Sequence, residues 1–292
     1  MKIIVTGSLG NTAKPLAQQL IAEGHDITVI SSSETKKSEI ESLGAKAAIG
    51  SITDVNFLVK AFEGADAVFA MTPPIIGETN IVENTGNAGK NYAEAIAKTG
   101  VKRLVMLSSV GADSPVENGP IKGLHHIEKL YNELENTSVT LLRAGYFYIN
   151  FFNDIPLIKN AGIIGGNYPE NIDIPLVHPT DIAKAAAEEL VKNTAGKNIR
   201  YVVSDSRPPA DFAKVLGTAV GNPELPWVEF TDEQSFEGMV QAGLPQEMAE
   251  LYVEMGKGMR TGVVQKDFIE QGSPVNGSVS LEDFAREFAY KF

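Results

Sequence analysis

The sequence predicts an α/β protein, with a doubly wound parallel sheet and a small, mostly helical C-terminal subdomain. Short apolar runs alternate with longer segments of helical spacing from residue 1 to about 150, which is typical of parallel strands joined by covering helices. The chain opens on such a run, followed at once by a glycine turn and a helix start. Glycines that can end a helix in the left-handed conformation stand just past four predicted helices, at Gly24, Gly44, Gly64 and Gly100.

The apolar runs predict six strands, at Lys2–Val5, Ile27–Ile30, Ala47–Ile49, Ala67–Met71, Arg103–Leu107 and Val139–Leu142. Helices are expected between them, at Ala13–Glu23, Thr35–Leu43, Val55–Phe62, Thr79–Thr99 and Gly123–Glu135. Residues 1–150 would form the first domain, and residues 175–205 would return a helix and a strand to it. The smaller subdomain would comprise residues 151–174 and 206–292, with a closing helix capped by Ser280.

The composition excludes several classes of function. The 37 acidic and 25 basic residues leave a net charge of −12, which repels the phosphates of nucleic acids. Without cysteine there is no disulfide, thiolate metal site or thiol nucleophile, and the four histidines include no ligand pair at helical spacing. No metal site is therefore predicted. No apolar stretch approaches the length of a membrane span, so the protein is expected to be soluble and cytoplasmic.

The opening turn is the strongest functional signal. A strand, a tight turn and a helix start aim backbone N–H groups and the positive end of a helix dipole at one point, where a pyrophosphate can bind. Its spacing is G-x-x-G-x-x-A, which differs from the common G-x-G-x-x-G fingerprint. The alternative is an ordinary turn of a parallel-sheet protein. The predicted cofactor contacts here are Thr6, Gly7, Leu9, Gly10, Asn11 and Thr12.

Ligands of open parallel sheets bind beyond the carboxyl ends of the strands, so the residues after the next strands are candidates too. No carboxylate follows the second strand to bind a ribose diol. The serine hydroxyls and the lysine that follow this strand suit a 2′-phosphate instead, and this favours NADP over NAD as the cofactor. The alternative is a solvated helix cap at Ser33. The predicted contacts after the second, third and fourth strands are Ser31, Ser32, Ser33, Lys36, Ser51, Thr72 and Pro73.

Four segments together resemble the NmrA-like branch of the atypical short-chain dehydrogenases/reductases: TGSLGNTAKPL, GAKAAIGSITDVNFLVKAFEGADAVFAMTPP, VKRLVMLSSVGA and LLRAGYFYIN. The resemblance implies a Rossmann-type domain that holds a nicotinamide dinucleotide, NADP (NADPH) or NAD, with a small C-terminal part over the cleft. Some members of this branch are NAD(P)H-dependent reductases of quinones or other small carbonyls. Others bind the dinucleotide as redox sensors.

The resemblance also points to catalytic candidates. The better-known short-chain reductases place a Ser at the end of the fifth strand and Tyr-x-x-x-Lys on the next helix. Here Ser108 and Ser109 stand at the strand end, and the helix has His125 and Lys129 at the i, i+4 spacing without that Tyr. Similar quinone reductases have His there, so His125 is expected to supply the proton, and Lys129 to assist and to bind the cofactor.

Alternatives remain for both helix residues. His125 could merely orient a substrate or line the cleft, and Lys129 could pair at the surface with Glu133. Lys122 competes for the lysine role.

An aromatic run after the sixth strand suits a flat apolar acceptor such as a quinone. The alternative is core packing where two domains meet. The predicted substrate contacts are Pro74, His125, Tyr146, Phe147, Asn150 and Phe151. Downstream, Thr180 or Asp181 is expected to cap a long helix.

Two functions therefore compete. One is an NAD(P)H-dependent oxidoreductase that reduces a small quinone-like or conjugated carbonyl substrate. The other is an NAD(P)-binding redox sensor without turnover, which would act on a protein partner. Neither direct nucleic-acid binding nor membrane binding is expected, and the sequence leaves a regulatory protein partner or a homodimer open.

Overall fold

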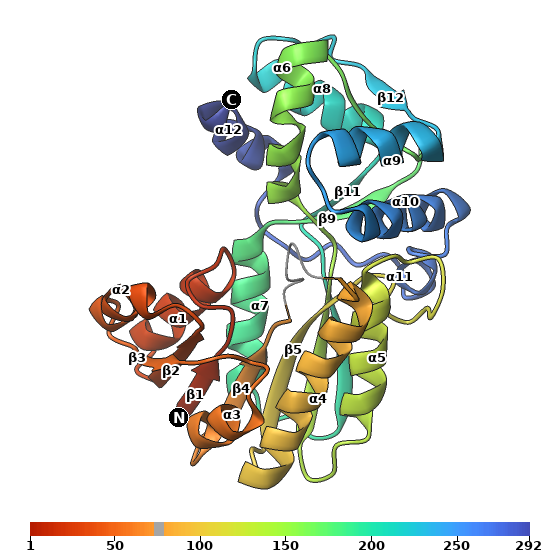
Figure 1. The fold of residues 1–292 in the computed structure, drawn as a ribbon. Coiled ribbons are helices and arrows are strands. Elements are labelled where there is room, and N and C mark those ends of the chain that lie inside the picture. The colour runs from red at the N-terminus through yellow and green to blue at the C-terminus, as the bar shows by residue number, and fades with distance from the viewer. Residues whose placement is uncertain (73–78) are drawn as a thin grey trace.

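The computed structural model describes residues 1–72 and 79–292; two predicted contacts, Pro73 and Pro74, lie outside the described residues. Parallel strands form a central sheet in the order β10-β6-β5-β4-β1-β2-β3 (Figure 1). The chain builds the sheet outward from β1 to β3, then crosses back to β4 and builds the other half. The predicted doubly wound α/β fold is confirmed, and its switch point lies between β1 and β4.

The strands of this sheet are β1 Lys2–Val5, β2 Asp26–Ser31, β3 Lys46–Ile49, β4 Ala67–Ala70, β5 Arg103–Ser109, β6 Ser138–Ala144 and β10 Lys197–Val202. Its helices are α1 Ala13–Ala22, α2 Lys37–Ser42, α3 Val55–Phe62, α4 Ile81–Thr99, α5 Ile121–Asn132 and α7 Pro179–Val191. The helix predicted over Thr35–Leu43 is in fact a 3₁₀ turn, η1 Glu34–Lys36, followed by the short α2. Positive φ angles confirm the four predicted glycine stops.

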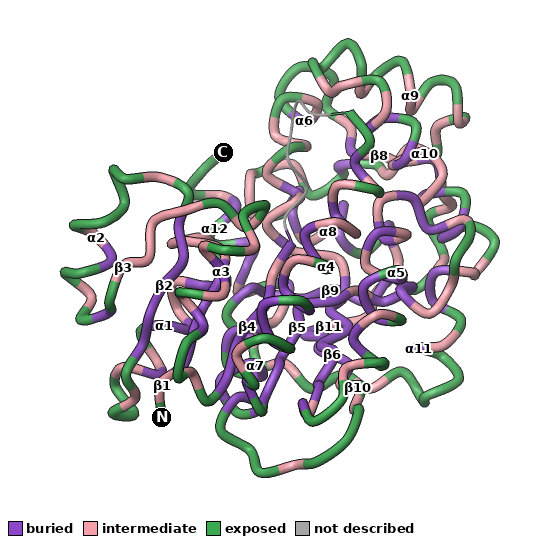
Figure 2. The backbone as a smooth tube through the Cα atoms, turned by 60° about the horizontal axis from the view of Figure 1, so that its bottom comes forward, coloured by how far each residue is buried: buried purple, intermediate pink, exposed green. Residues whose placement is uncertain are grey.

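Helices cover both faces of the sheet, because successive strand residues point to opposite sides. In β1, Ile3 and Val5 join the core beneath α1 and α7. Ile4 between them joins the core beneath α3, α4 and α5. Figure 2 shows the strands as a largely buried layer between more exposed helices. None of the helices within residues 1–72 and 79–292 is long and apolar enough to span a bilayer.

The remaining elements form a subdomain on one end of the sheet (Figure 1). They are β7 Tyr146–Phe147, η2 Tyr148–Asp154, α6 Ile155–Ala161, β8 Ile164–Gly166, β9 Ile174–Val177, β11 Asp205–Arg207, α8 Pro209–Ala219, β12 Trp227–Glu229, α9 Asp232–Gln241, α10 Gln246–Thr261, α11 Lys266–Glu270 and α12 Leu281–Lys291. Because β6 runs directly into β7, the subdomain lies at the carboxyl edge of the sheet. It has its own aromatic core, and Ser280 caps α12 as predicted.

The cap predicted for α7 is wrong. His178 is the N-cap, and its Nδ1 accepts a hydrogen bond from the N–H of Thr180 at 3.2 Å. Asp181 is buried instead, where its carboxylate accepts from Ser204 Oγ at 2.7 Å and from the N–H groups of Ser278 and Val279. The carboxylate therefore fastens the segment before α12 to α7, a contact between residues far apart in the chain.

Candidate cofactor and acceptor site

The loop between β1 and α1 has the geometry of an anion site. The N–H groups of Leu9, Asn11 and Thr12 have no acceptor in the part of the chain that the structure describes. They lie at or just before the N-terminus of the ten-residue α1, where the helix dipole also favours negative charge. Gly7 has φ +96, and an added Cβ there would lie 2.1 Å from Met71 Cε. The turn therefore requires glycine.

Hydrogen bonds hold this loop against the neighbouring strands. Thr6 Oγ1 accepts from the N–H of Met71 at 2.8 Å, and Tyr92 donates to the carbonyl of Met71 at 3.1 Å. The hydroxyl of Thr72 is buried and has no partner within residues 1–72 and 79–292. Since a buried hydroxyl without a partner is costly, Thr72 is available to a bound group beyond β4.

The segment after β2 is more tightly engaged than the sequence indicated. Ser31 Oγ accepts from Ser8 Oγ at 2.9 Å and from the N–H of Ser33 at 3.2 Å. Lys36 and Lys14 both bind the carboxylate of Glu39 at 3.0 Å. Ser32 is exposed, and Ser51 is hydrogen-bonded to Thr53 after β3. Lys14 is a cation beside this segment that the sequence analysis missed.

Ser108 is part of a buried ionic network. Its hydroxyl donates to Glu128 Oε1 at 2.6 Å, and Arg143 binds the same carboxylate at 2.7 Å. Arg143 also reaches Asp267 of α11 at 2.6 Å. The Ser108 hydrogen is thus committed to Glu128. Ser109, which is partly buried, donates to the carbonyl of Val110 at 2.9 Å.

The structure places His125 on α5, with its ring hydrogen-bonded to the loop that follows β5. Its Nδ1 lies 2.8 Å from the carbonyl oxygen of Ala112, and its Nε2 is buried without a partner among the described residues. Because a carbonyl only accepts, we assign the hydrogen to Nδ1, which makes Nε2 of the neutral ring an acceptor. The ring can donate from Nε2 only as an imidazolium.

The two lysines of this helix lie elsewhere. Lys129 is exposed on α5 and forms no ion pair with the described residues, the alternative partner Glu133 included. Lys122 binds Glu254 of α10 at 2.6 Å. The structure therefore brings neither lysine to the unpartnered nitrogen of His125.

The aromatic run divides between the two cores. Phe147 packs against the core beneath α1 and α7, whereas Phe151 is only 2% exposed in the subdomain core. The ring of Tyr146 lies 5.5 Å from that of Phe151. Burial raises the pKa of the Tyr146 hydroxyl, and Asn150 acts in the opposite direction. Tyr146, Phe147 and Asn150 are partly exposed, so these three are the accessible members of the predicted substrate contacts in this run.

The sequence analysis missed three further residues near Tyr146. Tyr168, which follows β8, Tyr252 of α10 and Asp154 at the end of η2 all act electrostatically on the Tyr146 hydroxyl. All three are partly exposed. Burial raises the pKa of Asp154 to about 7. A partly buried acid beside tyrosines has no signature in the local sequence, because the tyrosines come from three separate elements.

Comparison with known proteins identifies the first half of the chain. Residues 7–144 match the family model described as NAD(P)H-binding. This part of the chain is an NAD(P)H-binding domain. The family resemblance predicted from the sequence is thereby confirmed, and the loop between β1 and α1 lies at the start of the matched residues.

Similarity to individual proteins extends beyond the NAD(P)H-binding domain and covers most of the chain. An NAD(P)H azoreductase from Xenophilus azovorans is 25% identical over 257 residues, which cover 87% of this chain and 85% of that protein. The crystal structure of an NADPH-dependent quinone oxidoreductase from Escherichia coli, complexed with NADPH, superposes with a TM-score of 0.83 at 18% identity, covering 98% of this chain and 99% of that chain. A triphenylmethane reductase from Citrobacter gives 0.79 at 20% identity, with 100% of both chains covered.

Helix α10 of the subdomain is fastened to the NAD(P)H-binding domain at two points. Glu247 of α10 accepts from the N–H groups of Asn80 and Ile81 at 2.7 Å, so it caps α4. Further along α10, Glu254 accepts from the N–H of Glu117 at 3.1 Å. Tyr252 lies between these two anchors in sequence. Its helix is therefore held by both α4 and the loop after β5.

Proposed function

We propose that the protein is an NADPH-dependent reductase that acts on a small, flat, conjugated acceptor of the quinone or conjugated carbonyl type. The main support is the arrangement of the carboxyl edge, where unpaired N–H groups suit a pyrophosphate and His125 has an unpartnered Nε2. In the sheet, Ser109 of β5 pairs with Ala144 of β6. The segments that lead to Ala112 and to Tyr146 therefore leave the same edge from neighbouring strands. The names of the related reductases also support this function.

The residues suggest how a proton would be supplied. A quinone needs a hydride, which the reduced nicotinamide supplies when bound, and one proton to become a hydroquinone. In this proposal His125 donates that proton from Nε2 in its imidazolium form, and the support for it is that the Ala112 carbonyl holds Nδ1 and leaves Nε2 unpartnered among the described residues. Ser109 is the more accessible serine at the strand end, because it is only partly buried whereas Ser108 is buried and donates to Glu128.

NADPH is favoured over NADH by the residues that surround the end of β2. Serines replace the carboxylate that would bind a free ribose diol. Lys14 and Lys36 both form ion pairs with the carboxylate of Glu39, so two cations lie close together beside this segment. A ligand that binds only the native protein raises its melting temperature. NADPH should raise it more than NADH at equal concentration, and Lys14→Ala combined with Lys36→Ala should remove that difference. Lys98→Ala, which breaks only an exposed pair with Glu94, should leave it unchanged.

Turnover is tested by NADPH consumption with a panel of quinones and conjugated carbonyls. The proposed reductase should consume NADPH with at least one of these acceptors. The alternative of a redox sensor without turnover has one specific support, which is that the neutral His125 ring cannot donate from Nε2 and that the Ser108 hydrogen is committed to Glu128. NADPH binding without consumption of any acceptor would favour the sensor and contradict the reductase.

A further inference from the structure

One buried side chain holds the loop that carries the partner of His125. Asn118 is fully buried in the segment between β5 and α5. Its Nδ2 lies 3.0 Å from the carbonyl oxygen of Gly111 and 2.6 Å from that of Ser114. Because carbonyl oxygens only accept, the amide nitrogen must face both of them, and Oδ1 has no partner among the described residues. Both N–H groups of the Asn118 amide are therefore engaged by one turn of the loop.

This turn contains the carbonyl group that contacts His125. The N–H of Ser114 donates to the carbonyl of Gly111 at 3.2 Å and closes the turn. The Ala112 carbonyl lies inside it, 2.8 Å from Nδ1 of His125. The N–H of Ala112 donates to the carbonyl of Ser109 at 3.1 Å, so the turn is also tied to the end of β5. The orientation of the Ala112 carbonyl thus depends on the hydrogen bonds on either side of it.

The backbone beside Asn118 has an unusual conformation. Glu117 has φ +54, in the left-handed region that a residue with a Cβ rarely adopts. Such a conformation persists only where the surrounding structure holds it. Contacts from outside the loop are therefore needed to keep Glu117 in this conformation and Asn118 directed at the turn.

Helix α10 supplies contacts of this kind. Oε1 of Glu254 accepts from the N–H of Glu117 at 3.1 Å, and Lys257, one turn further along, pairs with the Glu117 carboxylate at 3.0 Å. Gly258 lies so close that a Cβ there would overlap the carbonyl oxygen of Glu117. The helix thus holds both the backbone and the side chain of Glu117.

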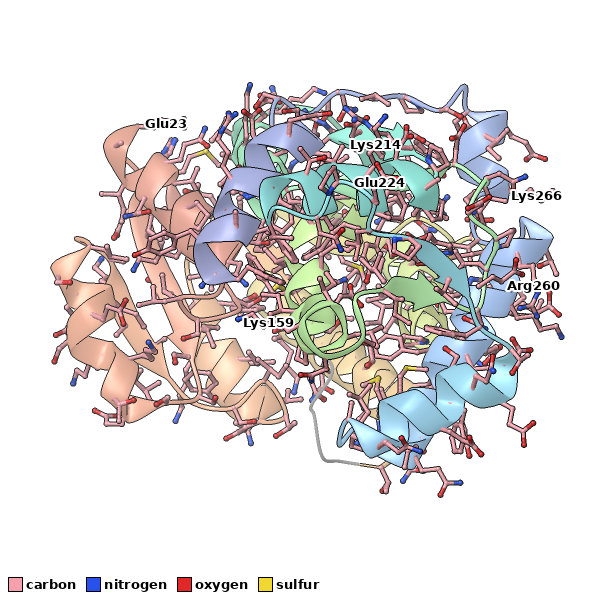
Figure 3. All side chains as sticks on the ribbon, turned by 90° about the horizontal axis from the view of Figure 1, so that it is seen from above. Glu23, Lys159, Lys214, Glu224, Arg260 and Lys266 are labelled. Carbon is pink, nitrogen blue, oxygen red and sulfur yellow. The ribbon has the colours of Figure 1, made fainter. Side chains whose placement is uncertain are left out.

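Helix α10 is itself fixed by other parts of the subdomain. Arg260, near its C-terminus (Figure 3), binds Asp232 of α9 at 3.0 Å. Asn167, which follows β8, donates to the carbonyl of Val253 at 2.9 Å and to the carboxylate of Asp232 at 2.9 Å. With α10 held in this way, its contacts to Glu117 can support the loop.

We propose that Asn118 is a positioning residue of the reductase and that α10 is its support. Asn118 keeps the Ala112 carbonyl on Nδ1 of His125, so the ring that has donated its proton from Nε2 retains its hydrogen on Nδ1. An imidazole that loses this contact can carry the hydrogen on either nitrogen and can rotate. This inference rests on the proposed function for the role of His125 as the proton donor.

The position of the hydrogen can be measured without turnover, in the full-length protein. NMR spectra that correlate ring nitrogens with ring hydrogens at about pH 8.5, where an imidazole is largely neutral, should show the His125 hydrogen on Nδ1. His125→Gln assigns these signals by their loss. Asn118→Ala removes both donors to the turn and should give a ring that exchanges between the two tautomers. A wild-type hydrogen on Nε2, or an unchanged tautomer in folded Asn118→Ala, would overturn the inference.

Variants of α10 test the support without altering the buried amide, and they test the inference even if Asn118→Ala does not fold. Glu254→Ala removes the acceptor of the Glu117 N–H and should also mix the tautomers, whereas Glu254→Gln keeps an oxygen acceptor and should restore the wild-type spectrum. Glu250→Ala, at an exposed acid of the same helix, is the control for lost charge and should change nothing. An unchanged spectrum in Glu254→Ala, or an equal change in Glu250→Ala, would contradict the role of α10.

Kinetics separate this inference from the proposed function. With the neutral quinone menadione, Asn118→Ala should lower kcat about 10-fold or more, because the proton donor is misplaced, while KM for NADPH should change less than about twofold. In a His125→Ala background, Asn118→Ala should cause no further loss of kcat, because it acts through the ring.

The two proposals can fail separately. Turnover in which the losses of kcat from Asn118→Ala and His125→Ala multiply in the double variant would overturn the positioning role and leave the reductase. A change of tautomer in Asn118→Ala in a protein that turns over no acceptor would support the positioning role and contradict the reductase.

Discussion

Arg143 and Glu128 form a buried two-point ion pair behind the predicted catalytic serine. Nη2 of Arg143 lies 2.7 Å from Oε2 of Glu128, and Nε lies 3.1 Å from Oε1. Both side chains are 6% exposed. Ser108 donates to the same carboxylate. The Glu128 carboxylate of α5 therefore links the end of β5, through Ser108, to β6, through Arg143. The loop that carries Ala112, the partner of His125, begins at this strand end.

Breaking the ion pair between Arg143 and Glu128 should strongly destabilise the folded protein. Arg143→Met leaves Glu128 buried without its cation, and the free energy of unfolding measured in urea should fall by about 3–5 kcal/mol. Glu94→Ala, which breaks an exposed pair with Lys98, should cost less than about 1 kcal/mol. A loss at Arg143→Met no larger than at the control would show that the network does not stabilise the fold.

Gly7→Ala should weaken cofactor binding more than it weakens the fold. Gly7 has φ +96, a backbone conformation that residues with a Cβ rarely adopt, so the loop backbone should shift and turn its N–H groups away from the phosphate site. The flexible end of the Met71 side chain can give way to the added Cβ. Titration with NADPH should show a Kd at least ~10-fold higher, with about 1.4 kcal/mol of binding lost. Gly24→Ala has a similar φ of +84 but open space around the Cβ; it should lose comparable stability from its backbone and keep the wild-type Kd. Equal NADPH affinity in both variants would count against the loop as the anchor.

His125→Ala should separate acceptors by their need for a proton. With a neutral quinone, removal of the imidazole should lower kcat by about 10²-fold or more. With a triarylmethane cation, which needs only a hydride, kcat should change little. His126→Ala, the exposed neighbour on α5, serves as the control and should affect neither. A kcat for the quinone that is unchanged in His125→Ala would remove His125 from the chemistry.

Asp154 should make the stability of the protein depend on pH. The pKa of an unperturbed aspartate is 3.8, and burial raises the pKa of Asp154 to about 7 in the folded protein, because burial disfavours the charged form. The folded state thus holds this proton more tightly than the unfolded chain does, so the stability that Asp154 contributes is complete below pH 4 and lost as the pH rises through 7. Asp154→Asn lacks this titration.

The variant should therefore gain stability relative to the wild type between pH 4 and pH 8, by about 2–4 kcal/mol. Asp154 acts electrostatically on the hydroxyls of Tyr146 and Tyr168, and burial raises the pKa of both hydroxyls, so they do not titrate in this range. Urea unfolding at the two pH values measures the difference. A difference that is constant with pH would show that Asp154 titrates normally in the folded state.

The local features of this protein follow from its sequence. The strand–turn–helix of residues 2–22, the glycine stops and the cap at Ser280 depend on residues within a few positions of one another, so the preferences of single residues and the periodicity of apolar ones predict them. The order of the sheet follows from the same pattern, because alternating strands and helices leave few arrangements of a parallel sheet.

Tertiary structure decided which of the predicted site residues are available. Ser108 looks free in sequence, but Glu128 and Arg143, 20 and 35 positions away, engage its hydroxyl. Asp154 looks like an ordinary acid, but it is partly buried at the start of α6, and no lysine or arginine of the described residues pairs with it. The energy of a charged or polar group depends on its burial and its partners, and those are set by segments that meet only when the chain folds.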